Sequence, residues 1–203
     1  MSETIELFLF LEPGADPDTD RVVQDLGDAE ALLVWVPDGA AAAKLADEAV
    51  AAGVQLMELY RGFDLASAAQ VIEAVDGRAA VGVAGFGIPA TQPIRDSATI
   101  FVGHPSADPA RHRVVREHAG GGRTTAVSVP DSPTAVRIAR ELADAGTGLI
   151  EICGGTSLIV ARDVATAVGD RVPVRLVTWP VDSIEPAAAY KAAFEAETAQ
   201  ETP

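Results

Sequence analysis

Two glutamates stand inside apolar segments, where a carboxylate is uncommon. Glu58 follows Leu-Met and Glu151 follows Leu-Ile, and both segments resemble short buried strands. A charged group left unpaired inside a covered sheet is costly, so each carboxylate needs a partner or an open site. Burial and a nearby arginine can tune such a group into a general acid or base. The alternative is a buried ion pair that fixes the strand register.

Arg175 is the candidate partner of Glu151. It lies in an apolar segment, and side chains alternate along a strand, so the two residues can pair if their strands are neighbours. We assign Glu151 as a candidate catalytic residue, and Arg175 and Glu58 as candidate ligand-binding residues. The position of Arg175 in the first half of the chain is Gly82, which leaves Glu58 without an equivalent partner.

A glycine pair follows Glu151. The backbone N–H groups of Gly154 and Gly155, with the Thr156 hydroxyl, open a predicted helix and can bind an anion such as phosphate. In a (β/α)8 barrel, phosphate often binds in this loop. The alternative is a tight turn with an ordinary helix cap. The first half has Arg61 at the position of Gly154, and its guanidinium can also contact an anion.

Two further side chains complete the candidate site. Cys153 is a candidate nucleophile if a positive group or a base lies beside it, and the alternative is a small core residue. His104 ends a predicted strand, at the edge where the active sites of parallel sheets form, and is a candidate acid or base. The other two histidines, His112 and His118, are expected on a solvated helix.

Several kinds of chemistry lack their sequence signatures. No group of His, Cys and carboxylate residues has the spacing of metal ligands, so we expect no metal site. The phosphate-binding loop, the dinucleotide-binding loop, the nucleophile elbow and the zinc-protease motif are absent as well. The sequence therefore leaves any cofactor unknown.

The elements that must position these residues occur twice. Residues 15–17 read Ala-Asp-Pro and return as residues 107–109, and residues 36–38 read Val-Pro-Asp and return as residues 129–131. The two candidate glutamates correspond in the same way. We therefore interpret the chain as a tandem duplication.

Each repeat is predicted to alternate strands with helices, because short apolar runs alternate with capped, helix-forming segments. Strands are predicted near residues 5–11, 31–36, 55–60, 79–84, 99–103, 125–129, 148–153 and 172–178. Helices are predicted after each Asp-Pro and over residues 38–52, 64–75, 131–145, 156–168 and 186–197.

Eight such strands in two matching units favour an α/β fold, a (β/α)8-type barrel made from two half-barrel repeats. The repeats are predicted as residues 1–96 and residues 97–203, the second ending in a C-terminal helix and tail. The alternative is two four-stranded parallel, doubly wound sheets related by a pseudo-twofold axis. The barrel is favoured because it places both glutamates at an active-site mouth instead of inside a covered sheet.

The charge balance excludes some partners. With 30 acidic and 15 basic residues, the net charge of −15 argues against nucleic acid and against an anionic membrane surface. No apolar run approaches the length of a transmembrane helix. A single cysteine and an acidic N-terminus favour the cytoplasm. Apolar helical faces leave a homo-oligomer open, and a small anionic molecule is the expected ligand.

Each repeat resembles one unit of a small bacterial α/β family known only as a domain of unknown function, number 6506. The resemblance covers nearly the whole chain and rests on residues 13–17, 53–59, 149–155 and 171–174. Because that unit usually occurs singly, the resemblance implies a fused pair here. It implies no catalytic role, since the activity of the family is not established. The first repeat departs from the pattern at residues 60–61.

Residues 53–61 are also similar to the second-strand region of class I keto-deoxy-phosphogluconate-type aldolases, in which a strand glutamate is the base. Those enzymes need a lysine on a strand to form a Schiff base. Lys44 and Lys191, the two lysines of this chain, are both predicted on helices, so we exclude this chemistry.

The sequence thus leaves two functions open. One is an enzyme acting on a small anionic metabolite by acid/base chemistry, with its candidate residues concentrated in the second repeat. The other is a non-catalytic small-ligand-binding or assembly protein, in which the glutamates are structural. The residues identify neither a substrate nor an oligomeric state.

Overall fold

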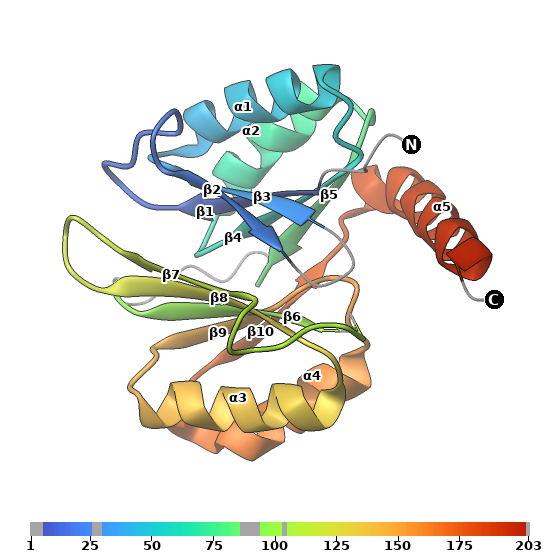
Figure 1. Ribbon diagram of the computed structural model, residues 1–203. Coiled ribbons are helices and arrows are strands. Elements are labelled where there is room, and N and C mark those ends of the chain that lie inside the picture. The colour runs from blue at the N-terminus through green and yellow to red at the C-terminus, as the bar shows by residue number, and fades with distance from the viewer. Residues whose placement is uncertain (1–5, 26–29, 86–93, 103–104, 202–203) are drawn as a thin grey trace.

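The computed structural model describes residues 6–25, 30–85, 94–102 and 105–201 of a mixed α/β protein (Figure 1). The first repeat forms β1 (Glu6–Leu11), β2 (Arg21–Asp25), β3 (Glu30–Val36), α1 (Gly39–Ala51), β4 (Leu56–Tyr60), α2 (Leu65–Val75) and β5 (Ala80–Ala84). The second repeat forms β6 (Ser97–Val102), β7 (Arg113–Glu117), β8 (Arg123–Val129), α3 (Ser132–Asp144), β9 (Leu149–Ile152), α4 (Leu158–Val168) and β10 (Val174–Thr178). Short 3-10 helices at Gly169–Arg171 and Val181–Ser183 flank β10, and α5 (Ile184–Glu201) follows.

The ten described strands lie in one sheet in the order β2-β3-β1-β4-β5-β10-β9-β6-β8-β7. In each repeat, four strands are parallel and the second strand pairs antiparallel with the third. The two half-sheets join where β5 and β10 pair antiparallel, with Ala84 opposite Val177 and Val83 opposite Thr178. The strand order of one half therefore mirrors that of the other about this seam.

The two half-sheets face each other, with α1 and α2 outside the first and α3 and α4 outside the second (Figure 1). The edge strand β2 is linked to the second repeat by a side chain, because Gln24 Nε2 donates to the carbonyl oxygens of His112 (3.3 Å), just before β7, and of Ala126 (3.4 Å) in β8. The predicted barrel-like fold built from two half-barrel repeats is thus confirmed, and the barrel is nearly closed. Doubly wound sheets carry helices on both faces, whereas α1 to α4 cover only the outer faces here.

The segment after each Asp-Pro is a turn followed by a strand, so the prediction of a first helix in each repeat is wrong. Asp16 starts the first turn, since its carbonyl accepts the N–H groups of Thr19 and Asp20 and its carboxylate accepts that of Asp18. The Arg-Val-Val that follows in both repeats is rich in β-branched residues, which favour a strand. The sheet therefore has ten described strands where the sequence predicted eight.

Strand direction also differs from that of a (β/α)8 barrel. Because β5 and β10 pair antiparallel, the parallel strands of the second repeat run opposite to those of the first. The strand C-termini of the two repeats therefore open at opposite ends of the barrel, whereas a (β/α)8 barrel gathers all of them at one mouth. The expectation that both glutamates lie at a single active-site mouth is wrong for this reason.

Polar side chains begin the helices that cover the sheet. Asp38 accepts the N–H of Ala41 at the start of α1, and Asp131 accepts that of Thr134 at the start of α3. Such a cap stabilises a helix by about 1 kcal/mol. These aspartates are the first residues of the helices predicted over residues 38–52 and 131–145, and both helices are confirmed. Ser157 caps α4, which lies within the helix predicted over residues 156–168.

An aromatic core fills the space between the half-sheets and holds the repeats together. Five large rings from both repeats are fully or almost fully buried there: Phe8, Phe10, Trp35, Tyr60 and Phe101. Phe8 stacks on Phe101 of the other repeat with ring centroids 4.7 Å apart. Each such ring contributes roughly 1.5–3 kcal/mol through burial. This core fixes how the repeats face each other and therefore where their polar side chains meet.

The C-terminal helix α5 leaves the barrel beside the start of β1. The Tyr190 hydroxyl of this helix donates to the Glu6 carboxylate of β1. Lys191 also lies in α5 and Lys44 lies in α1, so both lysines are on helices as predicted. Within the described part of the chain, no helix combines the length and apolar character needed to span a membrane.

Candidate functional site

Glu58 of β4 and Glu151 of β9 point into the space between the half-sheets, where they are 2% and 0% exposed. Glu58 Oε1 accepts the backbone N–H of Gly154 at 2.8 Å, and Glu151 Oε2 accepts the backbone N–H of Arg61 at 3.0 Å. Each donor is the third residue after the other repeat's glutamate. The duplication thus produces a reciprocal pair of hydrogen bonds, which we call the glutamate clasp (Glu58, Gly154, Glu151 and Arg61).

In the part of the chain that the structure describes, no contact places an arginine side chain beside the Glu58 carboxylate. The Tyr60 hydroxyl donates to its Oε2. Burial raises the pKa of Glu58 to about 8, and the charge of Glu6 adds to this, while hydrogen bonds from Tyr60 and Gly154 act in the other direction. The protonated carboxyl is therefore favoured at neutral pH.

Glu151 lies next to two arginines. Arg175 of β10 stands opposite Glu151 in the strand register, so the condition for their pairing, that their two strands are neighbours, is met. Burial raises the pKa of Glu151 to about 7, although the Arg61 N–H and the charges of Arg175 and Arg61 lower it. Both ionisation states of Glu151 are accordingly populated near neutral pH.

The Gly-Gly loop already holds a carboxylate, because the Gly154 N–H donates to Glu58. A Cβ on Gly154 would come within 2.8 Å of Glu58 Oε1 and 2.9 Å of Val177 Cγ1, whereas the Cβ position of Gly155 is open. Close packing therefore requires glycine at position 154 only. The Thr156 hydroxyl lies 3.1 Å from the Cys153 sulfur.

Cys153 is surrounded by groups that oppose its ionisation. Burial raises the pKa of its thiol to about 12, and the charge of Glu58 adds to this, while a hydrogen bond from Thr156 lowers it. A thiolate is the reactive form of cysteine. The structure places the thiol beside Glu58, in the group that also contains Tyr60 and Gly154.

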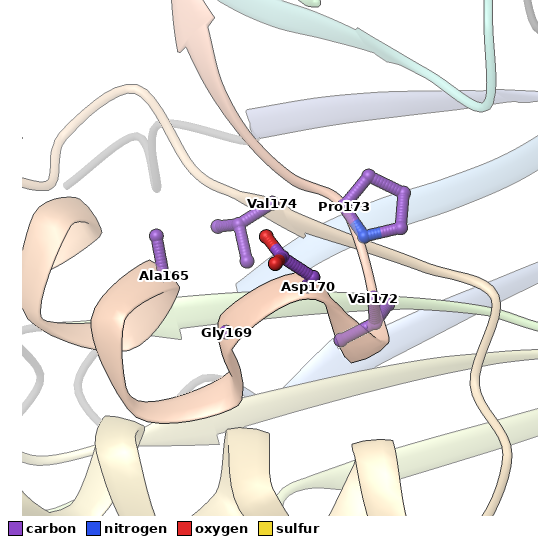
Figure 2. A pocket seen from close by; sticks show the side chains of 6 residues that line it. All are labelled: Ala165, Gly169, Asp170, Val172, Pro173 and Val174. Carbon is purple, nitrogen blue, oxygen red and sulfur yellow. The ribbon is translucent and has the colours of Figure 1, made fainter.

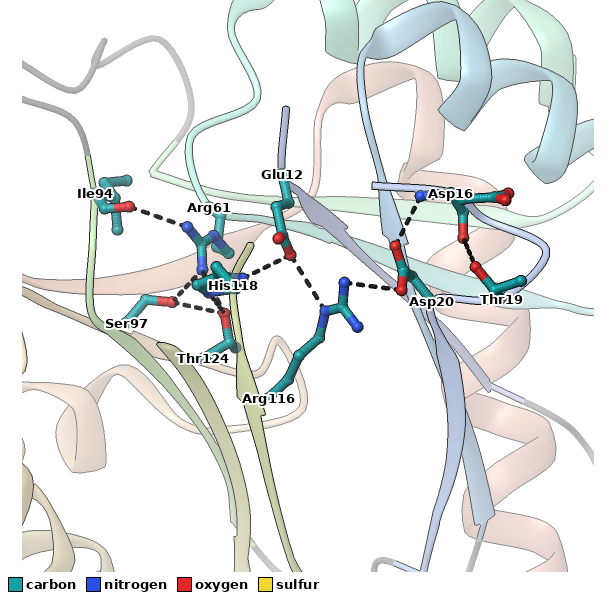
Figure 3. A network of polar contacts seen from close by, with 10 residues as sticks. All are labelled: Glu12, Asp16, Thr19, Asp20, Arg61, Ile94, Ser97, Arg116, His118 and Thr124. Carbon is teal, nitrogen blue, oxygen red and sulfur yellow. Dashed lines mark hydrogen bonds and ion pairs between the residues drawn. The ribbon is translucent and has the colours of Figure 1, made fainter. Parts of the chain in front are cut away.

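Arg61 connects the clasp to a second polar cluster. Its backbone adopts a left-handed conformation with φ 67°, and its guanidinium is buried. Nη1 contacts His118 Nε2 and Thr124 Oγ1, and Nη2 donates to the carbonyl of Ile94 at 3.0 Å (Figure 3). Burial lowers the pKa of Arg61, against the charges of Glu12 and Glu151.

His118 pairs with a carboxylate of the other repeat. Its Nδ1 lies 2.6 Å from Oε2 of Glu12, which follows β1. Arg116 bridges Glu12 Oε2 (3.2 Å) and Asp20 Oδ1 (3.0 Å), and its guanidinium lies 4.8 Å from the centre of the Trp35 ring. Figure 3 shows this chain of contacts running from Arg61 through His118 and Glu12 to Asp20.

The sequence analysis does not predict the buried position of His118, because it predicts a helix for the segment before this residue. In that interpretation His118 and His112 were solvated, but both are buried. A signal was present, since two valines followed by a run of three glycines and two threonines is typical of a β-hairpin. The predicted site residue His104 lies outside the described residues.

Two surface cavities lie away from the clasp. The larger has a volume of about 340 Å³ and lies between α4 and the start of β10, lined by Ala165, Gly169, Asp170, Val172, Pro173 and Val174 (Figure 2). The smaller, of about 160 Å³, is lined by residues of β7, β8 and α3, including Arg113 and Arg123. Neither is lined by a predicted site residue. In the described part of the chain, no three His, Cys, Asp or Glu side chains are grouped to hold a metal ion.

The model of a family of unknown function, DUF6506, matches the chain twice, at residues 5–99 and at residues 95–192. The chain belongs to the DUF6506 family. The two matches confirm the tandem duplication. Each DUF6506 repeat contains one glutamate of the clasp and supplies the N–H donor for the glutamate of the other. No curated protein and no solved structure matches the chain.

Proposed function

We propose that this DUF6506 protein is an enzyme that binds a small anionic metabolite and transfers a proton to or from it. The catalytic group is Glu151, and the anion is held by the guanidinium groups of Arg61 and Arg175. One observation carries the proposal: a fully buried carboxylate with a pKa of about 7 lies beside two arginines. A carboxyl group with this pKa suits acid/base catalysis at neutral pH.

The charges around Glu151 favour an anionic ligand. The charges of two arginines act on this one carboxylate, and burial strengthens such electrostatic interactions. Arginine also binds carboxylate and phosphate groups through two parallel hydrogen bonds.

The first repeat lacks an equivalent group, which supports a single catalytic site. Glu58 has a tyrosine hydroxyl and a backbone N–H as partners. The position of Arg175 is Gly82 in the first repeat, and a Cβ there would meet Val177 Cγ1 at 2.5 Å. Packing at the seam therefore leaves no room for an arginine beside Glu58.

A second candidate is a non-catalytic assembly protein in which the clasp is structural. The reciprocal hydrogen bonds favour it, because each carboxylate is satisfied by the other repeat. In this function the clasp fixes the relative position of the repeats. Gly154, Gly155 and Thr156 then form a turn and take no part in ligand binding.

A ligand screen separates the two candidates. Phosphorylated sugars and carboxylates are tested by thermal shift on the wild type, Glu151→Gln, Arg175→Gln and the repeat-related control Glu58→Gln. We expect one class of anion to raise the melting temperature of the wild type and of Glu58→Gln, and to lose this effect in Arg175→Gln. With that ligand in D2O, the wild type should exchange a ligand C–H for deuterium, and Glu151→Gln should exchange it at least about a hundredfold more slowly. If no anion shifts any of the four proteins, the enzyme proposal is wrong.

A further inference from the structure

The contacts of the His118 ring indicate which of its two nitrogens carries a proton. Its side chain is 4% exposed, and Nδ1 lies 2.6 Å from Glu12 Oε2. On the other side of the ring, Nε2 lies 3.0 Å from Thr124 Oγ1 and also contacts Nη1 of Arg61. Glu12 and Arg61 come from the first repeat, and His118 and Thr124 from the second, so both repeats are needed for this arrangement.

Hydrogen-bond chemistry assigns the proton to Nδ1. Nδ1 meets Glu12 in a close ion-pair contact that lacks hydrogen-bond alignment, and because a carboxylate only accepts, this contact favours the proton on Nδ1. A guanidinium only donates, so the Nε2 facing Arg61 must present its lone pair. The imidazole is therefore neutral, and its basic lone pair is directed at Arg61 and Thr124. This is the arrangement of a histidine base that a carboxylate orients.

The surrounding charges decide whether His118 can accept a second proton. Burial lowers its pKa, the charges of Arg61 and Arg116 lower it as well, and Glu12 acts in the opposite direction. Arg61 is the positive group that touches Nε2, the atom to be protonated. Asp20 lies beyond Arg116 and partly balances its charge.

We propose that Arg61 controls the protonation of His118, so that an anion bound to Arg61 enables His118 to take up a proton. This inference rests on the proposed function, which places an anionic ligand at Arg61. A bound anion neutralises the guanidinium and draws it away from Nε2, which then accepts a proton from the ligand or from solvent. The imidazolium that results donates from Nδ1 to Glu12 and from Nε2 to Thr124. Glu12 is thus a positioning residue, and binding and proton uptake are linked.

The duplication offers a variant that isolates the guanidinium. The residue that corresponds to Arg61 in the second repeat is Gly154, and the left-handed φ of 67° at Arg61 suits glycine. Arg61→Gly therefore removes the guanidinium, relieves the backbone and keeps the N–H that Glu151 accepts. Arg175→Gln is the matched control, because it removes a positive charge beside Glu151 that is not among the groups acting on His118.

The test is NMR of the ¹⁵N-labelled imidazoles as a function of pH, with the signals of His118 identified by their loss in His118→Gln. In the wild type we expect the Nδ1–H tautomer and a pKa below that of an ordinary histidine. In Arg61→Gly the pKa should rise by about one pH unit or more, and in Arg175→Gln it should stay unchanged. Saturating inorganic phosphate should raise it in the wild type and have no effect in Arg61→Gly.

The outcomes distinguish this inference from the proposed function. An Nε2–H tautomer, or the same pKa in the wild type and Arg61→Gly, overturns the control of His118 by Arg61. A rise in Arg61→Gly without any effect of phosphate supports that control but contradicts an anion site at Arg61, and with it the link between binding and proton uptake. Glu12→Gln supplies a second measurement, because it should depopulate the Nδ1–H tautomer, and an unchanged tautomer contradicts the positioning role of Glu12.

Discussion

Glu58 and Glu151 occupy the same place in the two repeats, and each carboxylate accepts the backbone N–H of the third residue after the other. The relationship is reciprocal in position but unequal in chemistry. Glu58 has Tyr60 as its side-chain partner, whereas Glu151 has the charges of Arg61 and Arg175 nearby. The duplicated backbone therefore supports two different environments.

The raised pKa of Glu58 predicts a pH-dependent stability. Between the usual carboxyl pKa of 4.5 and the folded value of about 8, the folded state holds a proton that the unfolded state has released. The contribution of Glu58 is therefore greatest below about pH 4.5 and is lost as the pH rises toward about 8. Between about pH 5 and about pH 8, the unfolding free energy of the wild type should fall by a few kcal/mol more than that of Glu58→Gln. Urea denaturation at each pH measures this difference.

The control for that measurement is Glu73→Gln, since Glu73 is exposed on α2. Glu151→Gln should behave like Glu58→Gln over a narrower range, because the pKa of Glu151 is about 7. Stability curves of Glu58→Gln and the wild type that run parallel across this range would show that Glu58 is ionised in the folded protein.

The two glycines after β9 should differ in how much stability the protein loses when each is replaced by alanine. A Cβ on Gly154 would come within 3.0 Å of atoms of Glu58, Val177 and Trp179, so we expect Gly154→Ala to destabilise the protein by about 1–3 kcal/mol. Gly155 has open space at its Cβ position and no left-handed backbone, so Gly155→Ala should change the stability by less than about 0.5 kcal/mol. Thermal or urea denaturation measures both. Equal effects of the two variants would contradict the close packing at Gly154.

The high pKa of Cys153 predicts an unreactive thiol. With a pKa of about 12, the thiolate is scarce at pH 8, and the side chain is only 9% exposed. We expect Ellman's reagent to modify the native protein at least about a hundredfold more slowly than the urea-unfolded chain. Fast modification of the native protein would instead support Cys153 as the nucleophile that the sequence suggested.

The link from the edge strand β2 to the second repeat predicts a loss of stability when the Gln24 side chain is replaced. Gln24 is buried and donates to two carbonyl oxygens of the other repeat, so Gln24→Met should destabilise the protein by about 1–3 kcal/mol. Gln55→Met is the matched control, because Gln55 is exposed. Urea denaturation compares the two variants, and indistinguishable midpoints would mean that Gln24 does not help to close the barrel.

Local sequence patterns predicted much of the fold and part of the candidate site. The helices that follow Asp38 and Asp131 could be predicted, because the hydrogen bond from a backbone N–H to a capping aspartate joins residues close in sequence. Side-chain alternation also made Arg175 a candidate partner of Glu151, and the structure supplies the strand pairing that this required. The sequence pattern does not place His118, because a short segment with two valines is compatible with either a helix or an edge strand until its partner strand is known.

By itself, the sequence determined that the protein is duplicated, that its elements alternate, and that two glutamates lie among apolar residues. These properties follow from repetition, periodicity and local hydrogen bonding, which neighbouring residues encode. Only the tertiary structure decided that β5 and β10 meet antiparallel, a seam of two residue pairs that no local pattern specifies. That seam reverses one repeat relative to the other, and the aromatic core between the half-sheets holds them there. Arg61 comes to lie beside His118 and Glu151 because the end of a strand in one repeat meets the start of the strands in the other.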